Sequence, residues 1–219
     1  MALTDYVVFC DFDGTITLED TTDQLLEQYA DPRWKDIEQE WLAGKIGSRD
    51  CLKKQIDCLP LFSSQEFEKF ISRVKIDSNF LAFYNFIKTQ KIDLYIVSDG
   101  LDLFIKEILK TYNLGEIPLF SNHLNWQEGR FNLSFPFYRE DCHSGAGMCK
   151  CRKVKEISAG RHVIYIGDGR SDFCAAKHAE IIFAKGKLIE ECARTNRACI
   201  PFENFQEVAN DLMKRILPC

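Results

Sequence analysis

Short apolar runs and amphipathic segments alternate along this chain. Apolar residues fill positions 6–10 and end at Asp11, which predicts a strand buried on both faces. From residue 21 to residue 77 the apolar positions recur at helical spacing instead. Further on, strands are predicted at 93–99, 162–168 and 181–185, and helices at 79–89, around 104–109, at 150–158, from Ser171 and near the C-terminal end.

Strands that alternate with helices predict an α/β fold, in which a parallel sheet is covered by helices on both faces. Two further strands are predicted on either side of a hairpin turn at Glu128-Gly129. The helical stretch lies between the first and second strands of the alternation, so we interpret it as an insertion. We expect a three-layer α/β/α core formed by residues 1–16 and 78–219, and an inserted cap of four helices over residues 17–77.

Start signals mark several of the four cap helices. Asp31-Pro32 has the form of an N-cap followed by proline at the first helical position. Ser48 is placed to cap the next helix. Ser63 and Glu66 have the spacing of a capping box. These signals predict a helical bundle rather than a single crossover helix between two strands.

Composition narrows the class of protein. The 219 residues are 46% apolar and include 17 Phe, which is enough for one sizeable core. The net charge of −5 gives no basic footprint for nucleic acid. No apolar run approaches the ~20 residues of a membrane span, and no signal-type segment opens the chain. We therefore expect a cytoplasmic protein, a monomer or homodimer, that binds neither nucleic acid nor membrane.

The ten cysteines fit free thiols better than a disulfide framework, because such an intracellular chain meets reducing conditions. One group stands apart. Cys142, His143, Cys149 and Cys151 fall within ten residues and are a candidate zinc site. Their spacing is not one of the common zinc patterns, so ordinary thiols remain the alternative.

Acidic residues follow three of the predicted strands, in "FCDFDGT", "IVSDG" and "YIGDGRSD". Because the carboxyl ends of parallel strands meet at one edge of a sheet, we expect Asp11, Asp13, Ser98, Asp168 and Asp172 to converge. Several carboxylates in one place repel each other unless a cation neutralises them. Hard oxygen ligands favour Mg²⁺, which in turn makes the site receptive to phosphate.

Two aspartates spaced by two residues can share the work of phosphate transfer. One carboxylate can attack phosphorus and form an aspartyl phosphate, while the other protonates the leaving oxygen and later activates water. Helix capping is the structural alternative, and taken singly it suits Ser98 and Asp172 well. It does not explain Asp-x-Asp-Gly-Thr together with the later Gly-Asp-Gly-x-Ser-Asp.

These three motifs resemble those of the haloacid dehalogenase superfamily of phosphatases, and the helical insertion resembles the cap of its phosphoserine phosphatase-like branch. The resemblance implies a Rossmann-like core and Mg²⁺ as cofactor. It also implies that Asp11 is the nucleophile and Asp13 the general acid and base. Asp11, Asp168 and the Asp13 carbonyl would bind the metal, Asp172 would support the site, and the segment Ser98, Asp99 and Gly100 would bind phosphate.

The superfamily also uses a phosphate-binding lysine at the start of a helix. Lys150 and Lys153 both qualify by position. The "MCK" before the helix resembles the Cys-Lys junction of members that act in methionine salvage or on phosphocholine, so Lys150 is preferred.

The sequence features that indicate the substrate are less specific than the three motifs. Phosphoserine phosphatases carry a glutamate shortly after the first motif, whereas this chain has Asp20 there. The "SDGLDLFI" segment resembles phosphatases of 2-hydroxy-3-keto-5-methylthiopentenyl 1-phosphate, and makes Asp102 a candidate substrate or supporting residue, or else a first-turn helix acid. Three aromatic residues of the cap are candidates for an apolar substrate wall or for cap core: Trp34, Trp41 and Phe62.

Other functions stay open at this point. Phosphoserine, phosphoethanolamine and phosphocholine are alternative substrates. A non-catalytic relative and a phosphotransferase on the same core are alternative classes of protein. A protein that had lost turnover would have no chemical reason to keep its four motif residues, which are Asp11, Asp13, Ser98 and Asp168.

Overall fold

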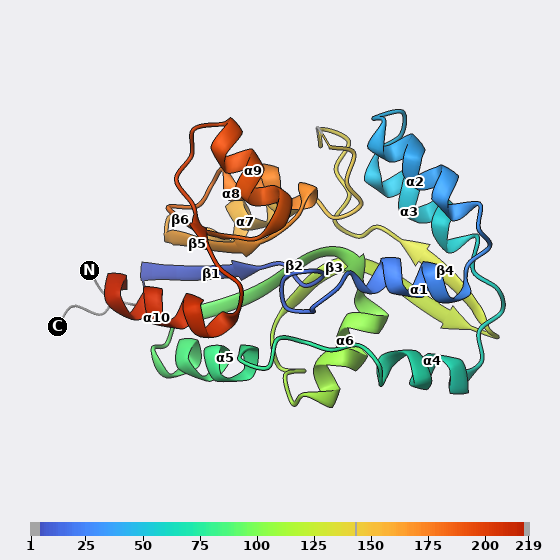
Figure 1. Ribbon diagram of the computed structural model, residues 1–219, viewed down its shortest axis with the longest axis horizontal. Coiled ribbons are helices and arrows are strands. Elements are labelled where there is room, and N and C mark those ends of the chain that lie inside the picture. The colour runs from blue at the N-terminus through green and yellow to red at the C-terminus, as the bar shows by residue number, and fades with distance from the viewer. Residues whose placement is uncertain (1–4, 143, 217–219) are drawn as a thin grey trace.

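The computed structural model describes residues 5–142 and 144–216, and its strands form one sheet. The strand order is β4-β3-β2-β1-β5-β6-β7, and neighbours are parallel except for β3 and β4 (Figure 1). The strands are Tyr6–Cys10 (β1), Asp93–Leu101 (β2), Leu119–Gln127 (β3), Arg130–Ser134 (β4), His162–Gly167 (β5), Ile181–Ala184 (β6) and Ile200–Pro201 (β7). The predicted α/β fold is confirmed.

The central strand β1 fixes the level at which the motifs meet. Its last residue, Cys10, pairs with Ile96 of β2 on one side and with Ile166 of β5 on the other. The chain segments that follow these three strands therefore leave the sheet at the same edge. Side chains just beyond β1 and β5 lie next to those near the end of β2.

Both faces of the sheet are buried, as expected for parallel strands. Val8 and Cys10 of β1 join the core under one face, whereas Val7 and Phe9 join the core on the other. Figure 1 shows α5, α6 and α10 on the first side of the sheet and α7, α8 and α9 on the second. These helices are Phe80–Thr89 (α5), Asp102–Thr111 (α6), Lys150–Ser158 (α7), Phe173–Ala176 (α8), Gly186–Arg194 (α9) and Phe205–Ile216 (α10).

The insertion after β1 contains the four expected helices, Thr21–Tyr29 (α1), Trp34–Leu42 (α2), Ser48–Ile56 (α3) and Ser64–Ile71 (α4). The first three lie beyond the carboxyl ends of the strands, and α2 packs against α3 (Figure 1). The fourth lies against α6 of the core, where the rings of Phe67 and Phe104 are 5.2 Å apart. The division into a core and a cap at residues 17 and 77 stays our proposal.

The helix-start signals had mixed outcomes. The capping box of Ser63 and Glu66 is confirmed. The prediction for Ser48 is wrong, because Gly47 is the N-cap and Ser48 is the first helical residue. The prediction for Asp31 is also wrong: its carboxylate accepts a backbone N–H two residues on at 3.0 Å, which stabilises a turn that precedes α2.

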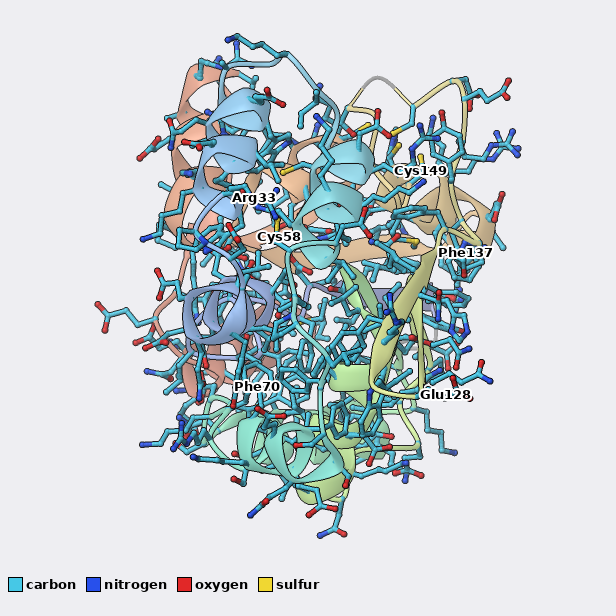
Figure 2. The ribbon with its side chains drawn as sticks, turned by 90° about the vertical axis from the view of Figure 1, so that its right-hand side faces the viewer. Arg33, Cys58, Phe70, Glu128, Phe137 and Cys149 are labelled. Carbon is cyan, nitrogen blue, oxygen red and sulfur yellow. The ribbon has the colours of Figure 1, made fainter. Side chains whose placement is uncertain are left out.

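The hairpin turn between β3 and β4 lies where it was expected. Glu128 and Gly129 both have positive φ, 51° and 80°, as the favoured two-residue turns of hairpins require. Figure 2 shows Glu128 at the tip of this hairpin. The helix predicted from Ser171 is instead a short 3₁₀ turn, Arg170–Asp172, followed by α8, and the two-residue strand β7 had not been predicted. Within the described residues, no helix has the length and apolarity to cross a bilayer.

Candidate active site

The predicted residues converge at the carboxyl edge of the sheet. Asp11 follows β1 directly, and its N–H donates to the carbonyl of Ile166 at the end of β5. One oxygen from each of the Asp11, Asp168 and Asp172 carboxylates lies within 4.8 Å of the others. This is the structural basis for treating the edge as one site.

Lys150 is held at the centre of this group. Its ammonium nitrogen lies 2.8 Å from Asp11 Oδ2, from Asp172 Oδ1 and from the hydroxyl of Ser171. The residue is only 3% exposed. Burial by itself lowers the pKa of this lysine, but the charges of Asp11 and Asp172 outweigh that effect, so the pKa is raised and the ammonium stays charged.

Asp172 is fully buried, and each of its two carboxylate oxygens accepts hydrogen bonds from two donors. One oxygen accepts from Lys150 and from the hydroxyl of Tyr165 at 2.6 Å. The other accepts from the backbone N–H groups of Asp168 and Gly169, both at 3.0 Å. Asp172 therefore fixes both Lys150 and the turn that carries Asp168, and it has little free capacity for a ligand of its own.

Asp13 is held by a residue of the cap helix α1 and by a residue of β2. One oxygen accepts from the backbone N–H of Thr21 at 3.0 Å and from its hydroxyl, and the other accepts from Ser98 Oγ at 3.3 Å. Burial raises the pKa of Asp13, while these hydrogen bonds oppose the rise. A carboxyl group with a raised pKa holds a proton more readily near neutral pH, which suits a general acid.

Two glycines of the motifs make room for carboxylates. A Cβ on Gly100 would lie 2.3 Å from Asp13 Oδ2, and a Cβ on Gly14 would lie 2.6 Å from Asp168 Oδ2. Gly14 also has a φ of 70°, which favours glycine. The Gly100 N–H donates to Ser98 Oγ at 2.9 Å. These glycines are therefore needed for the geometry of the site.

Burial and neighbouring charges raise the pKa of both Asp11 and Asp168. Burial and then the charge of Asp172 raise the pKa of Asp11 well above its usual range, and the same two causes raise the pKa of Asp168 to about 6. A divalent cation would relieve this repulsion, and carboxylate oxygens are the donors that Mg²⁺ prefers. Asp11 and Asp168 suit the role of ligands better than Asp172 does. Each oxygen of Asp172 already accepts from two donors, whereas each oxygen of Asp11 accepts from one.

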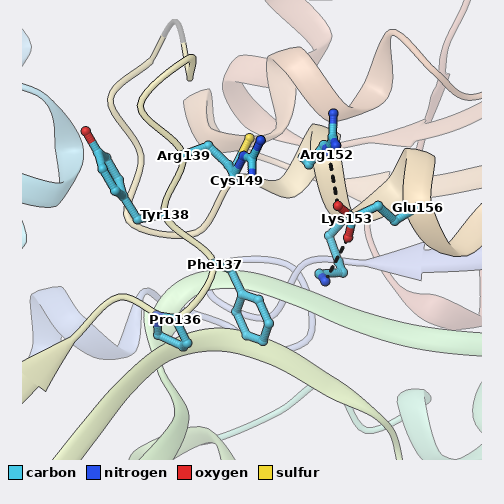
Figure 3. Close-up of a pocket in the computed structure, with 8 residues that line it drawn as sticks. All are labelled: Pro136, Phe137, Tyr138, Arg139, Cys149, Arg152, Lys153 and Glu156. Atoms are coloured by element: carbon cyan, nitrogen blue, oxygen red, sulfur yellow. Dashed lines mark hydrogen bonds and ion pairs between the residues drawn. The ribbon is translucent and has the colours of Figure 1, made fainter.

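The second candidate lysine lies elsewhere. Lys153 pairs with Glu156 at 3.0 Å, and its ammonium sits 4.7 Å from the centre of the Phe137 ring. Both charged side chains line a surface pocket of about 150 Å³. Figure 3 shows them there together with Cys149. The contacts of Lys150 with Asp11 and Asp172 thus favour Lys150 as the motif lysine.

The side chains of Asp99 and Asp102 turn to other partners. The Asp99 carboxylate accepts from Ser48 Oγ at 2.7 Å and from the Met148 N–H at 2.9 Å. The Asp102 carboxylate is bound by Lys106, the His123 ring and the Leu124 N–H, at 2.7, 3.0 and 2.9 Å respectively. For Asp102 this arrangement agrees with a first-turn helix acid.

The three aromatic candidates of the cap differ in position. Phe62 is 2% exposed and packs against Tyr29, with ring centres 4.6 Å apart, so it belongs to the core. Trp34 is also buried, at 7% exposed. Trp41 lies near the end of α2, and its ring centre is 6.0 Å from the guanidinium carbon of Arg170. The cap therefore lies beside the turn that carries Asp168.

The cysteine-rich loop is only partly described. The sulfur atoms of Cys149 and Cys151 are 3.6 Å apart. His143 lies outside the described residues, and within those residues the aspartate cluster is the one group of three that meets the spacing of a metal site. The zinc site stays a prediction.

Sequence reasoning missed four residues that organise the site. Thr15 Oγ1 donates to Asp168 at 2.8 Å, and Thr21, Tyr165 and Ser171 contact Asp13, Asp172 and Lys150 as described above. One of them carried a usable signal. A tyrosine inside a fully buried strand needs a hydrogen-bond partner, so Tyr165 pointed to a polar group at this edge.

Known proteins match this chain over most of its length. The family described as "Putative Phosphatase" matches residues 6–184. The chain belongs to this family. It is 31% identical to the 2-hydroxy-3-keto-5-methylthiopentenyl-1-phosphate phosphatase of Geobacillus kaustophilus, over 95% of this chain and 96% of that protein. It is 34% identical to Pdp3-interacting factor 1 of Schizosaccharomyces pombe, over 94% of each chain.

Solved structures agree on the fold. A substrate-bound phosphoserine phosphatase superposes with a TM-score of 0.72 at 22% identity, over 94% of this chain and 97% of that chain. The chain therefore shares its fold with this phosphatase. The family match identifies this protein as a phosphatase.

Proposed function

We propose that this family member is a Mg²⁺-dependent phosphomonoester hydrolase that works through an aspartyl phosphate on Asp11. One observation carries the proposal: the buried Lys150 ammonium lies 2.8 Å from Asp11 Oδ2, in the carboxylate cluster that Asp11 forms with Asp168 and Asp172. A fixed positive charge beside a carboxylate is what a phosphate needs in order to approach that carboxylate closely.

In the first step an Asp11 oxygen attacks phosphorus, and the bond from phosphorus to the leaving oxygen breaks. Asp13 gives its proton to that oxygen, so the product leaves as an alcohol or enol. In the second step Asp13 removes a proton from water, which attacks phosphorus and frees Asp11 and inorganic phosphate. Lys150, Ser98 and the backbone around Asp99 and Gly100 would bind the phosphate oxygens in both steps.

The metal would be held by Asp11, Asp168 and the backbone carbonyl of Asp13. Bound there, Mg²⁺ would neutralise part of the charge of the phosphate. The chain's own contribution is to hold Asp168 in place, through the hydroxyl of Thr15 at 2.8 Å and through the turn fixed by Asp172.

Our best candidate for the substrate is 2-hydroxy-3-keto-5-methylthiopentenyl 1-phosphate. Relatives in Bacillus and Geobacillus that carry this activity in their names are 30–31% identical over nearly the whole chain. Phosphoserine, phosphoethanolamine and phosphocholine are the compounds to compare. The cytoplasmic location expected from the sequence stays a prediction.

The test is phosphate release by the purified protein from these four compounds, with and without Mg²⁺. We expect the methylthio substrate to be preferred, and Asp11→Asn to lower kcat at least about a thousandfold. Asp36→Asn, an exposed acid at the start of α2, is the matched control and should stay within about twofold of wild type. Equal activity of Asp11→Asn and wild type would disprove the role of Asp11.

A further inference from the structure

The first residue of α3 contacts the core instead of its own helix. Gly47 caps α3 without a side-chain hydrogen bond, and the Ser48 hydroxyl donates to Asp99 Oδ2 at 2.7 Å. Asp99 stands between Ser98 and Gly100 in the second motif. A hydrogen bond to a carboxylate is stronger than one between neutral groups, so this is a firm link between the cap and the core.

The other oxygen of Asp99 binds the segment that leads to Lys150. Oδ1 accepts from the Met148 N–H at 2.9 Å and from the side-chain amide of Asn122 at 3.1 Å. The Met148 carbonyl in turn accepts from the Lys150 N–H at 2.9 Å. One carboxylate thus touches both the cap helix and the backbone two residues before Lys150.

The backbone of α3 lies directly on the same segment. The Arg49 N–H donates to the Gly145 carbonyl at 3.1 Å, and a Cβ on Gly47 would come within 3.0 Å of that carbonyl oxygen. The Arg49 guanidinium also covers the Tyr138 ring at 4.1 Å. Figure 2 shows α3 beside the loop that leads to Cys149. The cap hairpin α2–α3 and this loop therefore form one contact next to the site.

We propose that Asp99 is a positioning residue that couples closure of the α2–α3 hairpin to the placement of Lys150. The inference rests on the proposed function, because it assigns Lys150 the task of binding phosphate. When Ser48 binds one oxygen of Asp99, the carboxylate is held in the orientation in which its other oxygen binds Met148. Opening of the hairpin releases this restraint on the segment before Lys150.

Steady-state kinetics with the methylthio substrate provide the first test. Ser48→Ala removes only the cap contact, so we expect KM to rise about tenfold with kcat within about twofold of wild type, and Ser48→Thr to restore KM. Asp99→Ala also releases the loop, so kcat should fall at least about tenfold in addition. The double variant should be no worse than Asp99→Ala, because Ser48 acts through Asp99.

Ser64→Ala is the matched control, since Ser64 is the exposed first residue of α4, away from this contact. Its KM and kcat should equal those of wild type. An unchanged KM in Ser48→Ala, or effects of Ser48→Ala and Asp99→Ala that add in the double variant, would overturn the coupling.

Hydrogen exchange of backbone amides tests the same coupling without turnover. We expect Ser48→Ala to speed exchange by about tenfold in residues 48–56 and, through Asp99, in residues 144–149. Asp99→Ala should speed exchange in both segments by at least as much. Asp99→Asn can keep both links, since Ser48 Oγ can accept from its amide, so its protection should match wild type. Unchanged exchange at 144–149 in either Ser48→Ala or Asp99→Ala refutes the inference. If the expected exchange pattern appears while the wild type hydrolyses no substrate, the proposed function fails and the coupling stands.

Discussion

The ammonium group of Lys150 joins residues from the ends of two strands. Asp11 follows β1, whereas Ser171 and Asp172 follow β5, and each contributes one oxygen at 2.8 Å. Because Asp172 is itself bound by Tyr165 and two backbone amides, it offers the Lys150 ammonium a fixed negative partner. Such preorganisation spares the site the cost of moving charges during the reaction.

For single residues, we predict that replacing Lys150 lowers kcat far more than replacing the nearby Lys153. Lys150→Met should lower kcat by about a hundredfold to a thousandfold, because the bound phosphate loses a buried positive charge. Lys153→Met should stay within about twofold of wild type, because its ammonium pairs with Glu156 in another pocket. Phosphate release measures both variants, and circular dichroism checks that they fold. Equal losses in the two variants would contradict the assignment.

The elements show why some predictions succeeded. Acidic motifs follow β1 and β5, and the apolar runs of these strands are long enough to identify from sequence. The second motif lies inside β2, which continues to Leu101 and not only to residue 99 as predicted. The two-residue strand β7 has no such run, and it exists because β6 offers it a free edge. Ser48 was predicted as an N-cap from its residue type, but its hydroxyl donates to the carboxylate of Asp99 instead. Propensity describes local preferences and cannot include a partner 51 residues away.

The capping box of α4 gives a prediction for a single element. Ser63→Ala removes the side-chain acceptor of the Glu66 N–H and should lower the free energy of unfolding by about 1 kcal/mol. Urea denaturation measures this loss. Ser64→Ala, one residue later, should cost less than about 0.5 kcal/mol. Because α4 packs on α6 and not over the site, kcat of Ser63→Ala should equal that of wild type.

Across the whole molecule, the acidic edge links stability to pH and metal. The pKa of Asp168 is raised from 3.8 to about 6 by burial and by Asp172. The folded state thus binds this proton more tightly than the unfolded state does. Without metal, the stabilisation from the Asp168 proton is fully present below pH 3.8 and is lost as the pH rises through about 6.

Magnesium should therefore stabilise the protein more at pH 7.5 than at pH 5, because at low pH it competes with protons for the same oxygens. We expect saturating Mg²⁺ to raise Tm by about 3–8 °C at pH 7.5, relative to EDTA, and by less than half as much at pH 5. Differential scanning calorimetry measures the shifts. In Asp168→Asn, the Mg²⁺-induced rise in Tm should differ less between pH 7.5 and pH 5. Equal rises in Tm at the two pH values in the wild type would contradict the linkage.

The site as a whole could be predicted because its motifs mark the ends of adjacent strands.

The order of those strands determines when the site can form during protein synthesis. Strand β1 lies between β2 and β5, and Thr15 is 153 residues before Asp168, its hydrogen-bond partner. At about 5–20 residues per second, a ribosome needs on the order of ten seconds to make that interval. During synthesis the nascent chain therefore carries its first motif without the second half of the site, so phosphatase activity appears only after β5 and its acidic turn have left the ribosome.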